Sequence, residues 1–76
     1  MEKILETIIL NLVDEKEAVE IERKDSENEV TFGVKVAEKD MGRVIGRQGR
    51  LAKSIRTLMK SVAAKEGKKV SVEFIG

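Results

Sequence analysis

The chain has 76 residues, a length that suits one small domain. It contains neither cysteine nor histidine, so disulfides, thiolate metal sites and an imidazole base for catalysis near neutral pH are all excluded. We therefore expect a protein that is not an enzyme and that uses no metal and no cofactor.

The net charge of +1 conceals an uneven distribution along the sequence. Residues 1–38 carry five basic and eleven acidic side chains, a net charge of −6, whereas residues 39–76 carry ten basic and three acidic ones, a net charge of +7. A basic half favours a polyanion as partner, although a solvated surface of lysine and glutamate would give the same counts. The amino terminus has neither the apolar core of a signal peptide nor the length of a membrane span, so we expect a cytoplasmic protein without membrane contact.

Apolar residues in the first part of the chain follow the spacing of a helix and then that of strands. An amphipathic helix of about three turns is predicted from the apolar positions Ile4, Leu5, Ile8, Ile9, Leu12 and Val13. Residues 14–17 interrupt this pattern and form a connection. From residue 19 apolar and polar side chains alternate, so residues 19–22 and 30–36 are predicted as two antiparallel strands joined by a turn at 25–28.

The second half of the chain predicts two helices and a third strand. Asp40 is expected to be the N-cap of a short helical segment at 41–45. A longer helix starts at Arg50 and is predicted to end at Gly67. Its core face is expected to hold Leu51, Ile55, Leu58, Met59 and Val62, and its opposite face the cations Arg50, Lys53, Arg56 and Lys60. Residues 70–75 alternate as a strand.

The resulting order is helix, strand, strand, helix, helix, strand. Because two helices separate the second strand from the third, these two strands are expected to pair in parallel through a right-handed crossover. We predict an α+β fold in which a three-stranded mixed sheet, with the second strand at its centre, is covered on one face by the helices. The whole chain, residues 1–76, is expected to be one domain.

The glycines Gly46 and Gly49 bracket a basic and a polar residue between the two predicted helices. A Walker loop requires Gly-Lys-Ser/Thr, but Arg50 and Leu51 follow Gly49 here, so no hydroxyl is offered to Mg²⁺. The dinucleotide-binding fingerprint requires a longer glycine pattern in a larger parallel sheet. Both nucleotide-enzyme interpretations are therefore disfavoured.

The segment Val44-Ile45-Gly46-Arg47-Gln48-Gly49, set between two helices, resembles the GXXG signature of the KH domain. The order of elements is similar to the type II arrangement of that fold, and over the whole chain the sequence resembles the KhpA-like family of small bacterial KH proteins. This resemblance implies a cytoplasmic RNA-binding protein, acting as an RNA chaperone with a KhpB-like KH partner in cell-wall growth and cell-shape control. It also implies that the loop clamps single-stranded RNA.

Backbone amides at Arg47, Gln48 and Gly49, close to a helix start, are suited to face phosphate oxygens. The candidate RNA-binding residues are Gly46, Arg47, Gln48, Gly49, Arg50, Arg43, Val44, Ile45, Lys53, Lys68 and Lys69. Two interpretations stay open for the apolar positions Val44, Ile45, Leu51 and Val72, which form either the floor of a groove or ordinary core. The exposed cations are likewise either contacts or solvated charges, and the glycines either a clamp or a tight turn.

Two functions fit this sequence. The first is a non-catalytic module that binds single-stranded RNA. The second is a dimerising interaction module, as a homodimer or with another protein, in which the loop and helices form the interface and RNA contact is secondary. Both aromatic residues, Phe32 and Phe74, lie at inward strand positions, which predicts no aromatic stacking platform and weak sequence selectivity.

Overall fold

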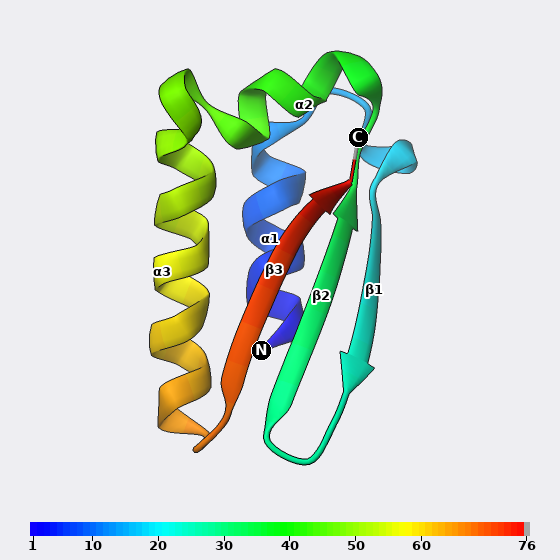
Figure 1. Cartoon of the computed structure of the whole chain (residues 1–76). Helices are drawn as coiled ribbons and strands as arrows, with labels where there is room; N and C mark the ends of the chain where they lie inside the picture. Colours follow the sequence, from blue (N-terminus) through cyan, green and yellow to red (C-terminus); the bar gives the residue numbers. More distant parts are fainter. Residues whose placement is uncertain (76) are drawn as a thin grey trace.

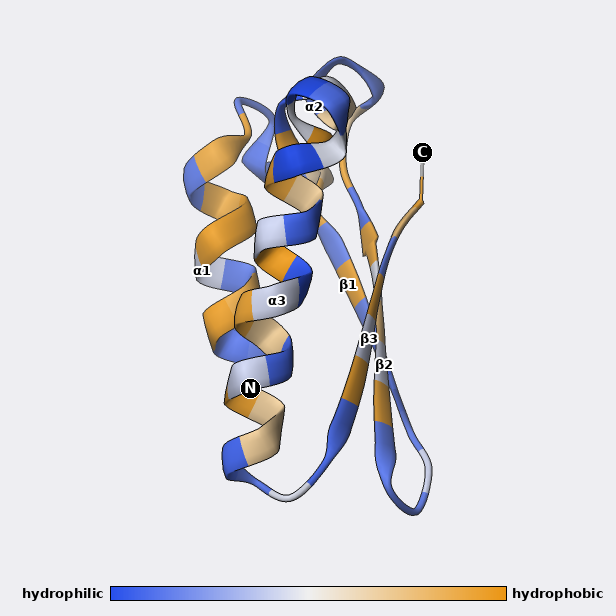
Figure 2. Cartoon of the chain, turned by 60° about the vertical axis from the view of Figure 1, so that its left-hand side comes forward, coloured by the Kyte–Doolittle hydropathy of each residue, from blue (hydrophilic) through white to orange (hydrophobic). Residues whose placement is uncertain are grey.

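The computed structural model describes residues 1–75 and shows two layers, a sheet and a set of helices on one of its faces (Figures 1 and 2). The elements follow the predicted order: α1 (Glu2–Leu12), β1 (Glu20–Asp25), β2 (Glu29–Lys35), α2 (Glu38–Ile45), α3 (Arg50–Lys65) and β3 (Lys69–Ile75). Short 3-10 turns, η1 (Lys16–Ala18) and η2 (Arg47–Gly49), precede β1 and α3. None of the helices within residues 1–75 has the length and apolarity needed to span a membrane.

The sheet has the strand order β1-β2-β3, with β1 antiparallel and β3 parallel to the central β2. This confirms the predicted mixed sheet. Along β2 the side chains of Val30, Phe32 and Val34 are buried, whereas the residues between them point to the face that no helix covers. The strict alternation in the sequence therefore marks a strand with one buried face.

The core lies between this sheet face and the helices. Fully buried side chains come from α1 (Leu5 and Ile9), from β2, from α2 (Val44) and from α3 (Met59). α2 runs across one end of the sheet, while α1 and α3 pack along it (Figure 1). The link between α2 and α3 therefore lies at the end of the molecule near the close of β2 and β3, rather than over the middle of the sheet.

Asp40 does not cap α2, so this prediction was wrong. The helix begins earlier, at Glu38, and Asp40 lies within it with an exposed fraction of only 1%. Its carboxylate accepts hydrogen bonds from the backbone N–H groups of Glu15 (3.0 Å) and Asp14 (3.2 Å). The Glu15 bond, assisted by the Asp14 bond, lowers the pKa of Asp40 from its ordinary value. Through these hydrogen bonds Asp40 links the α1–β1 connection to α2. The local sequence does not indicate this contact.

The carboxyl end of α3 closes at Gly67, as predicted. This glycine has a φ of +70°, and its N–H donates to the carbonyl of Ala64 at 3.1 Å. The N–H of Lys68 donates to the carbonyl of Ala63 at 3.0 Å. These two bonds form a Schellman motif, which turns the chain directly into β3.

Candidate nucleic-acid interface

The turn between α2 and α3, residues 46–49, has a positive φ at three of its four positions. The φ angles are +76° at Gly46, +57° at Gln48 and +74° at Gly49. Gly46 has a second constraint, because a Cβ at this position would lie 2.6 Å from the Cβ of Leu51. The first glycine therefore permits the close approach of α3, whereas the second serves only the backbone angle.

One backbone amide of this turn is used inside it. The N–H of Gly49 donates to the carbonyl of Gly46 at 3.2 Å, and the N–H of Arg50, at the start of α3, donates to the carbonyl of Arg47. Of the three amides expected to face phosphate, those of Arg47 and Gln48 therefore stay candidates, whereas that of Gly49 already has an acceptor. A right-handed residue followed by a left-handed one, as at Arg47 and Gln48, directs successive amides to one side and forms an anion-binding concavity.

The candidate side chains around the turn fall into three groups. Arg47, Gln48 and Arg50 are exposed. Arg43 is also exposed, but its Nη1 pairs with Oδ1 of Asp14 at 3.1 Å, so its charge is directed at the α1–β1 connection. Val44 has no exposed surface and belongs to the core. Of the remaining apolar candidates, Ile45 and Leu51 are half-buried, and Val72 is buried and belongs to the core.

The flank of α3 that faces β3 is basic. Nε of Arg56 donates to the carbonyl oxygen of Val72 at 3.0 Å. One turn further along the helix, Lys60 borders a hollow of about 280 Å³ together with Lys68 and Lys69, and Glu29 of β2 is its one acidic lining residue. The structure thus brings Lys68 and Lys69 together with Lys60, a helix cation that was predicted only as part of a charged face.

Lys53, by contrast, does not border that hollow. It lines a shallow depression on the outer surface of α3 with Ser54, Thr57, Leu58 and Ser61. Arg56 and Lys60 were not among the candidate RNA-binding residues. The helical spacing of the sequence separates the polar face of α3 from its apolar face, but it does not show which side of the polar face lies next to β3. Their spacing of four residues on the basic helix was the available signal.

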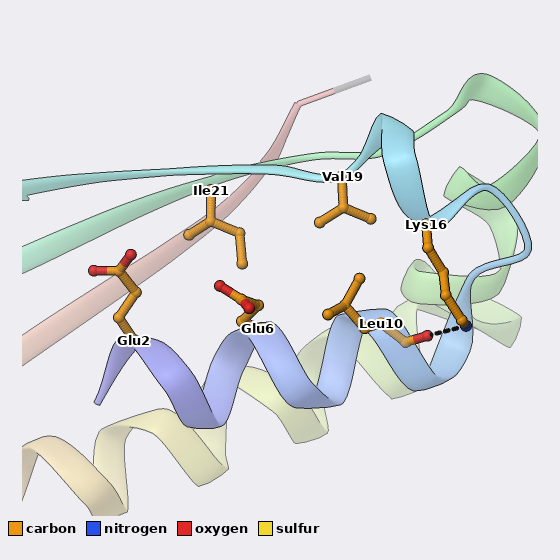
Figure 3. A pocket seen from close by; sticks show the side chains of 6 residues that line it. All are labelled: Glu2, Glu6, Leu10, Lys16, Val19 and Ile21. Atoms are coloured by element: carbon orange, nitrogen blue, oxygen red, sulfur yellow. Dashed lines mark hydrogen bonds between the residues drawn. The ribbon is translucent and has the colours of Figure 1, made fainter.

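The opposite edge of the sheet is acidic. Figure 3 shows a hollow of about 290 Å³ between α1 and β1, lined by Glu2, Glu6, Leu10, Lys16, Val19 and Ile21. Nζ of Lys16 donates to the carbonyl of Leu10 at 2.6 Å, so this cation is directed at the carboxyl end of α1. Since β1 and β3 are opposite edges, the charge split of the sequence becomes a split in space, with the β3 edge suited to a polyanion.

A third surface is apolar and lies between α1 and α3, which Figure 2 shows side by side. Ile4 and Leu58 have exposed fractions of 41% and 46%, and Ile8 is half-buried. Together with neighbouring polar residues these three line a hollow of about 440 Å³. We call Ile4, Ile8 and Leu58 the α1–α3 patch. Leu58 and Arg56 point to opposite flanks of α3, because one contacts the α1 side and the other β3.

The helix pair joined by a Gly-X-X-Gly turn, packed on a mixed sheet in this order, defines a KH domain of type II. Residues 2–74 match the family described as KhpA/KhpB, KH domain, and the chain belongs to this family.

Relatives that the match covers over nearly their whole length are named RNA-binding protein KhpA. The RNA-binding protein KhpA of Clostridium acetobutylicum is 48% identical over 75 residues, which cover 99% of this chain and 100% of the relative. The RNA-binding protein KhpA of Caldanaerobacter subterraneus is 47% identical over the same shares. That of Listeria monocytogenes is 44% identical, with 99% of each chain covered.

Proposed function

We propose that this protein is a non-catalytic RNA-binding protein that clamps single-stranded RNA at residues 46–49. The observation that carries the proposal is the backbone of the turn, in which Arg47 and the left-handed Gln48 present successive amides between two glycines at the start of α3. Such amides can donate hydrogen bonds to phosphate oxygens, and the positive end of the helix dipole attracts their negative charge. The family and the names of the relatives favour RNA as the polymer.

The strand is proposed to run from the turn along the groove between α3 and the β3 edge. Arg47 and Arg50 stand at its beginning, and Lys60, Lys68 and Lys69 at its far end. At 1.5 Å per residue, the stretch of helix between Arg50 and Lys60 is roughly 15 Å long, which provides room for the about four nucleotides that a KH clamp holds. Val44 supports this groove from the core, and Arg43 lies beside it with a paired charge.

The cellular role follows from the resemblance and is part of the same proposal. The protein acts in the cytoplasm as an RNA chaperone, together with a KhpB-like KH protein, in cell-wall growth and cell-shape control. A chaperone role agrees with a clamp that contacts the phosphate backbone, because such contacts carry little sequence information.

The test of the clamp is the double variant Arg47→Asp/Gln48→Asp, with fluorescence anisotropy of a labelled nine-nucleotide single-stranded RNA and light scattering for mass. We expect binding to weaken at least tenfold, because carboxylates at these two positions repel the phosphates that the amides of the turn would bind, while the mass stays the same. The control Asn11→Asp/Lys24→Asp changes the net charge equally on exposed positions of α1 and β1 and is expected to bind nearly as the native protein does. Native binding by the first variant would refute the clamp, and a change in mass alone would assign the turn to a protein interface.

The α1–α3 patch favours a second function, a dimerising interaction module. Exposed apolar side chains on neighbouring helices of a small domain gain free energy when a second copy covers them. The same patch suits a KhpB-like partner. Because the patch and the basic groove lie on opposite flanks of α3, dimerisation and RNA binding do not compete for the same surface.

The variant Leu58→Lys tests this second function. If the patch is the interface, this change lowers the solution mass to that of a monomer and leaves the affinity for the short RNA unchanged. Thr57→Lys is the matched control, since it places the same side chain at the adjacent, exposed position of α3, about 100° around the helix. An unchanged mass for Leu58→Lys would rule out the patch as the contact surface.

A further inference from the structure

The β1 strand is an edge of the sheet, and the register shows which of its backbone groups point outward. Continued beyond the end of β1, the register places Ser26 opposite Glu29, and the N–H of Ser26 donates to the carbonyl of Glu29 at 2.8 Å. Hydrogen-bonded pairs alternate with non-bonded pairs along an antiparallel ladder, so the N–H and C=O groups of Ile21 and Arg23 point away from β2. Since β1 pairs only with β2, these groups face the outside of the sheet.

The hollow between α1 and β1 lies beside this edge and has an apolar floor. Figure 3 shows Val19 and Ile21 pointing toward α1, where Leu10 lies, and each of these three side chains is half-buried. The hollow of about 290 Å³ far exceeds the roughly 30 Å³ that a water molecule takes up in the liquid. It therefore has room for aliphatic side chains that enter from the edge.

The side chains around the β1 edge are mainly acidic. Glu2 and Glu6 stand at the rim of the hollow, and Glu20 and Glu22 are exposed on the opposite face of β1. Within residues 1–75, no ion pair uses Glu6, Glu20 or Glu22, while Glu2 lies 4.0 Å from Arg23. Carboxylates on both faces of the edge repel a nucleic acid and attract a cationic segment.

We propose that the β1 edge binds an extended basic segment of a partner protein, which adds to the sheet as a fourth strand beside residues 19–23. The backbone of the segment pairs with the outward groups of Ile21 and Arg23, and its side chains alternate between the two faces of the sheet. Aliphatic side chains enter the hollow, and lysine or arginine side chains lie opposite Glu20 and Glu22. The β1 edge lies across the sheet from the RNA groove, so this proposal does not depend on the clamp.

A second copy of the chain does not suit this edge. In a symmetric pair, β1 of one copy would lie antiparallel to β1 of the other, and Glu20 and Glu22 would face the same acidic residues across the pair. Like charges directly opposite one another destabilise a sheet. The charges therefore favour a different protein that contributes a basic strand.

The experiment titrates the full chain into the peptide Ser-Val-Lys-Ile-Lys-Val-Ser, labelled at its amino end and amidated at its carboxyl end, and follows fluorescence anisotropy. As an extended strand, this peptide presents aliphatic side chains on one face and lysines on the other. We expect a Kd on the order of 100 μM. The peptide Ser-Val-Glu-Ile-Glu-Val-Ser, in which only the charges are reversed, is expected to bind at least about tenfold more weakly.

Two N-methylated forms of the basic peptide test whether it adds as a strand. One form is methylated at the two lysine amides and the other at the three aliphatic amides. Alternate amides of a strand point to opposite sides, so only one of the two sets faces β1. We expect one form to lose binding and the other to keep it.

The variant Glu20→Lys/Glu22→Lys tests the site on the protein. It is expected to bind the basic peptide at least about tenfold more weakly, because two attractive cross-strand pairs become repulsive. Glu27→Lys/Glu66→Lys is the matched control, since it changes the net charge equally at exposed positions outside β1 and the hollow. This control is expected to bind nearly as the native protein does. Thermal unfolding followed by circular dichroism verifies that both variants are folded at the temperature of the measurement.

Four results would overturn the proposal. They are equal affinity of the native protein for the two peptides of opposite charge, equal affinity for the two N-methylated forms, and equal losses in the two charge variants. The fourth is a solution mass that rises with the concentration of the native protein but not with that of Glu20→Lys/Glu22→Lys, which would assign the β1 edge to a second copy.

Discussion

Gly46 and Gly49 both have positive φ angles, but only Gly46 lies against a neighbour. A Cβ at Gly46 would meet the Cβ of Leu51 at 2.6 Å and its backbone nitrogen at 3.0 Å, whereas a Cβ at Gly49 would meet nothing within 4 Å. We therefore expect Gly49→Ala to lower the free energy of unfolding by about 1 kcal/mol, the cost of a left-handed alanine. Gly46→Ala is expected to cost about 2–4 kcal/mol, because its φ of +76° with a ψ of 177° is a conformation almost restricted to glycine and overpacking is added. Urea unfolding followed by circular dichroism measures both.

Gly42 supplies the control for these two glycines. It lies within α2 and has no positive φ, and a Cβ added there would meet nothing within 4 Å, so Gly42→Ala is expected to stabilise the protein by about 0.5–1 kcal/mol. Equal losses for the variants of Gly46 and Gly49 would mean that Leu51 moves aside at little cost, and that the turn does not require close contact with α3.

The hydrogen bonds between the Asp40 carboxylate and the α1–β1 connection are expected to be sensitive to acid. Its pKa in the folded protein is lowered, chiefly by the N–H of Glu15, below the value of about 3.9 for an unfolded carboxyl group. The stabilisation is therefore complete above pH 5 and is lost as the pH falls through the folded pKa, below about pH 4. We expect Asp40→Asn to be less stable at pH 7, and its thermal midpoint to fall less than that of the native protein between pH 5 and pH 3.

Glu15 supplies the matched control for Asp40. Its pKa is also lowered, chiefly by the hydrogen bond with Lys39, but this is an exposed ion pair with a small effect on stability. Glu15→Gln should thus follow the native pH profile closely. Parallel profiles for Asp40→Asn and the native protein would show that the two hydrogen bonds to the connection contribute nothing that depends on charge.

At the scale of elements, the residues of α3 that are buried differ from those that the spacing of its apolar residues predicts. Ile55 and Met59 are buried as expected, but Leu58 is exposed, and Ala52 and Ala63 are buried in its place. Alanines let the helix backbone approach the sheet closely. The apolar residues of α3 cover a larger part of the helix surface than the core buries. Leu58, at one side of that apolar surface, belongs to the α1–α3 patch instead. Ile4 on α1 is exposed for the same reason.

This difference predicts unequal costs for neighbouring residues of α3. Met59→Ala is expected to lower the free energy of unfolding by about 2–5 kcal/mol, since it leaves a cavity in the core. Leu58→Ala is expected to cost at most about 0.5 kcal/mol when the monomer is measured at low protein concentration. Urea unfolding of both variants at two protein concentrations is the measurement. A large loss for Leu58→Ala that grows with protein concentration would show that a second copy covers the patch.

The sequence predicts those features that depend on neighbours in the chain. Alternation identified β2, helical spacing identified α1 and α3, and the glycine pattern located the turn at residues 46–49. The contacts that it did not predict join distant segments: Asp40 to the α1–β1 connection, Arg43 to Asp14, and Arg56 to Val72. Each depends on where a separate segment ends in space, and no local pattern of side chains encodes this position.

At the scale of the whole molecule, the strand order separates charge. The acidic residues lie at the edge of the sheet formed by β1, and the lysines of the α3–β3 region lie at the opposite edge, formed by β3. The central strand β2 separates the two edges. A net charge of +1 gives little attraction for a polyanion at long range. The separation nonetheless orients an approaching strand, because its phosphates are repelled from one edge and attracted to the other.

The salt dependence of RNA binding tests whether this basic edge makes the contacts. For single-stranded nucleic acid, each phosphate neutralised contributes about −0.7 to the slope of log K against log salt concentration. Lys68→Gln removes one cation from the edge and is expected to make the slope shallower by about 0.7. Lys24→Gln lowers the net charge by the same amount on β1 and is expected to leave the slope unchanged, because β1 lies at the opposite edge of the sheet. If both variants shift the slope equally, the attraction depends on net charge alone, and the proposed path of the strand along α3 and β3 is wrong.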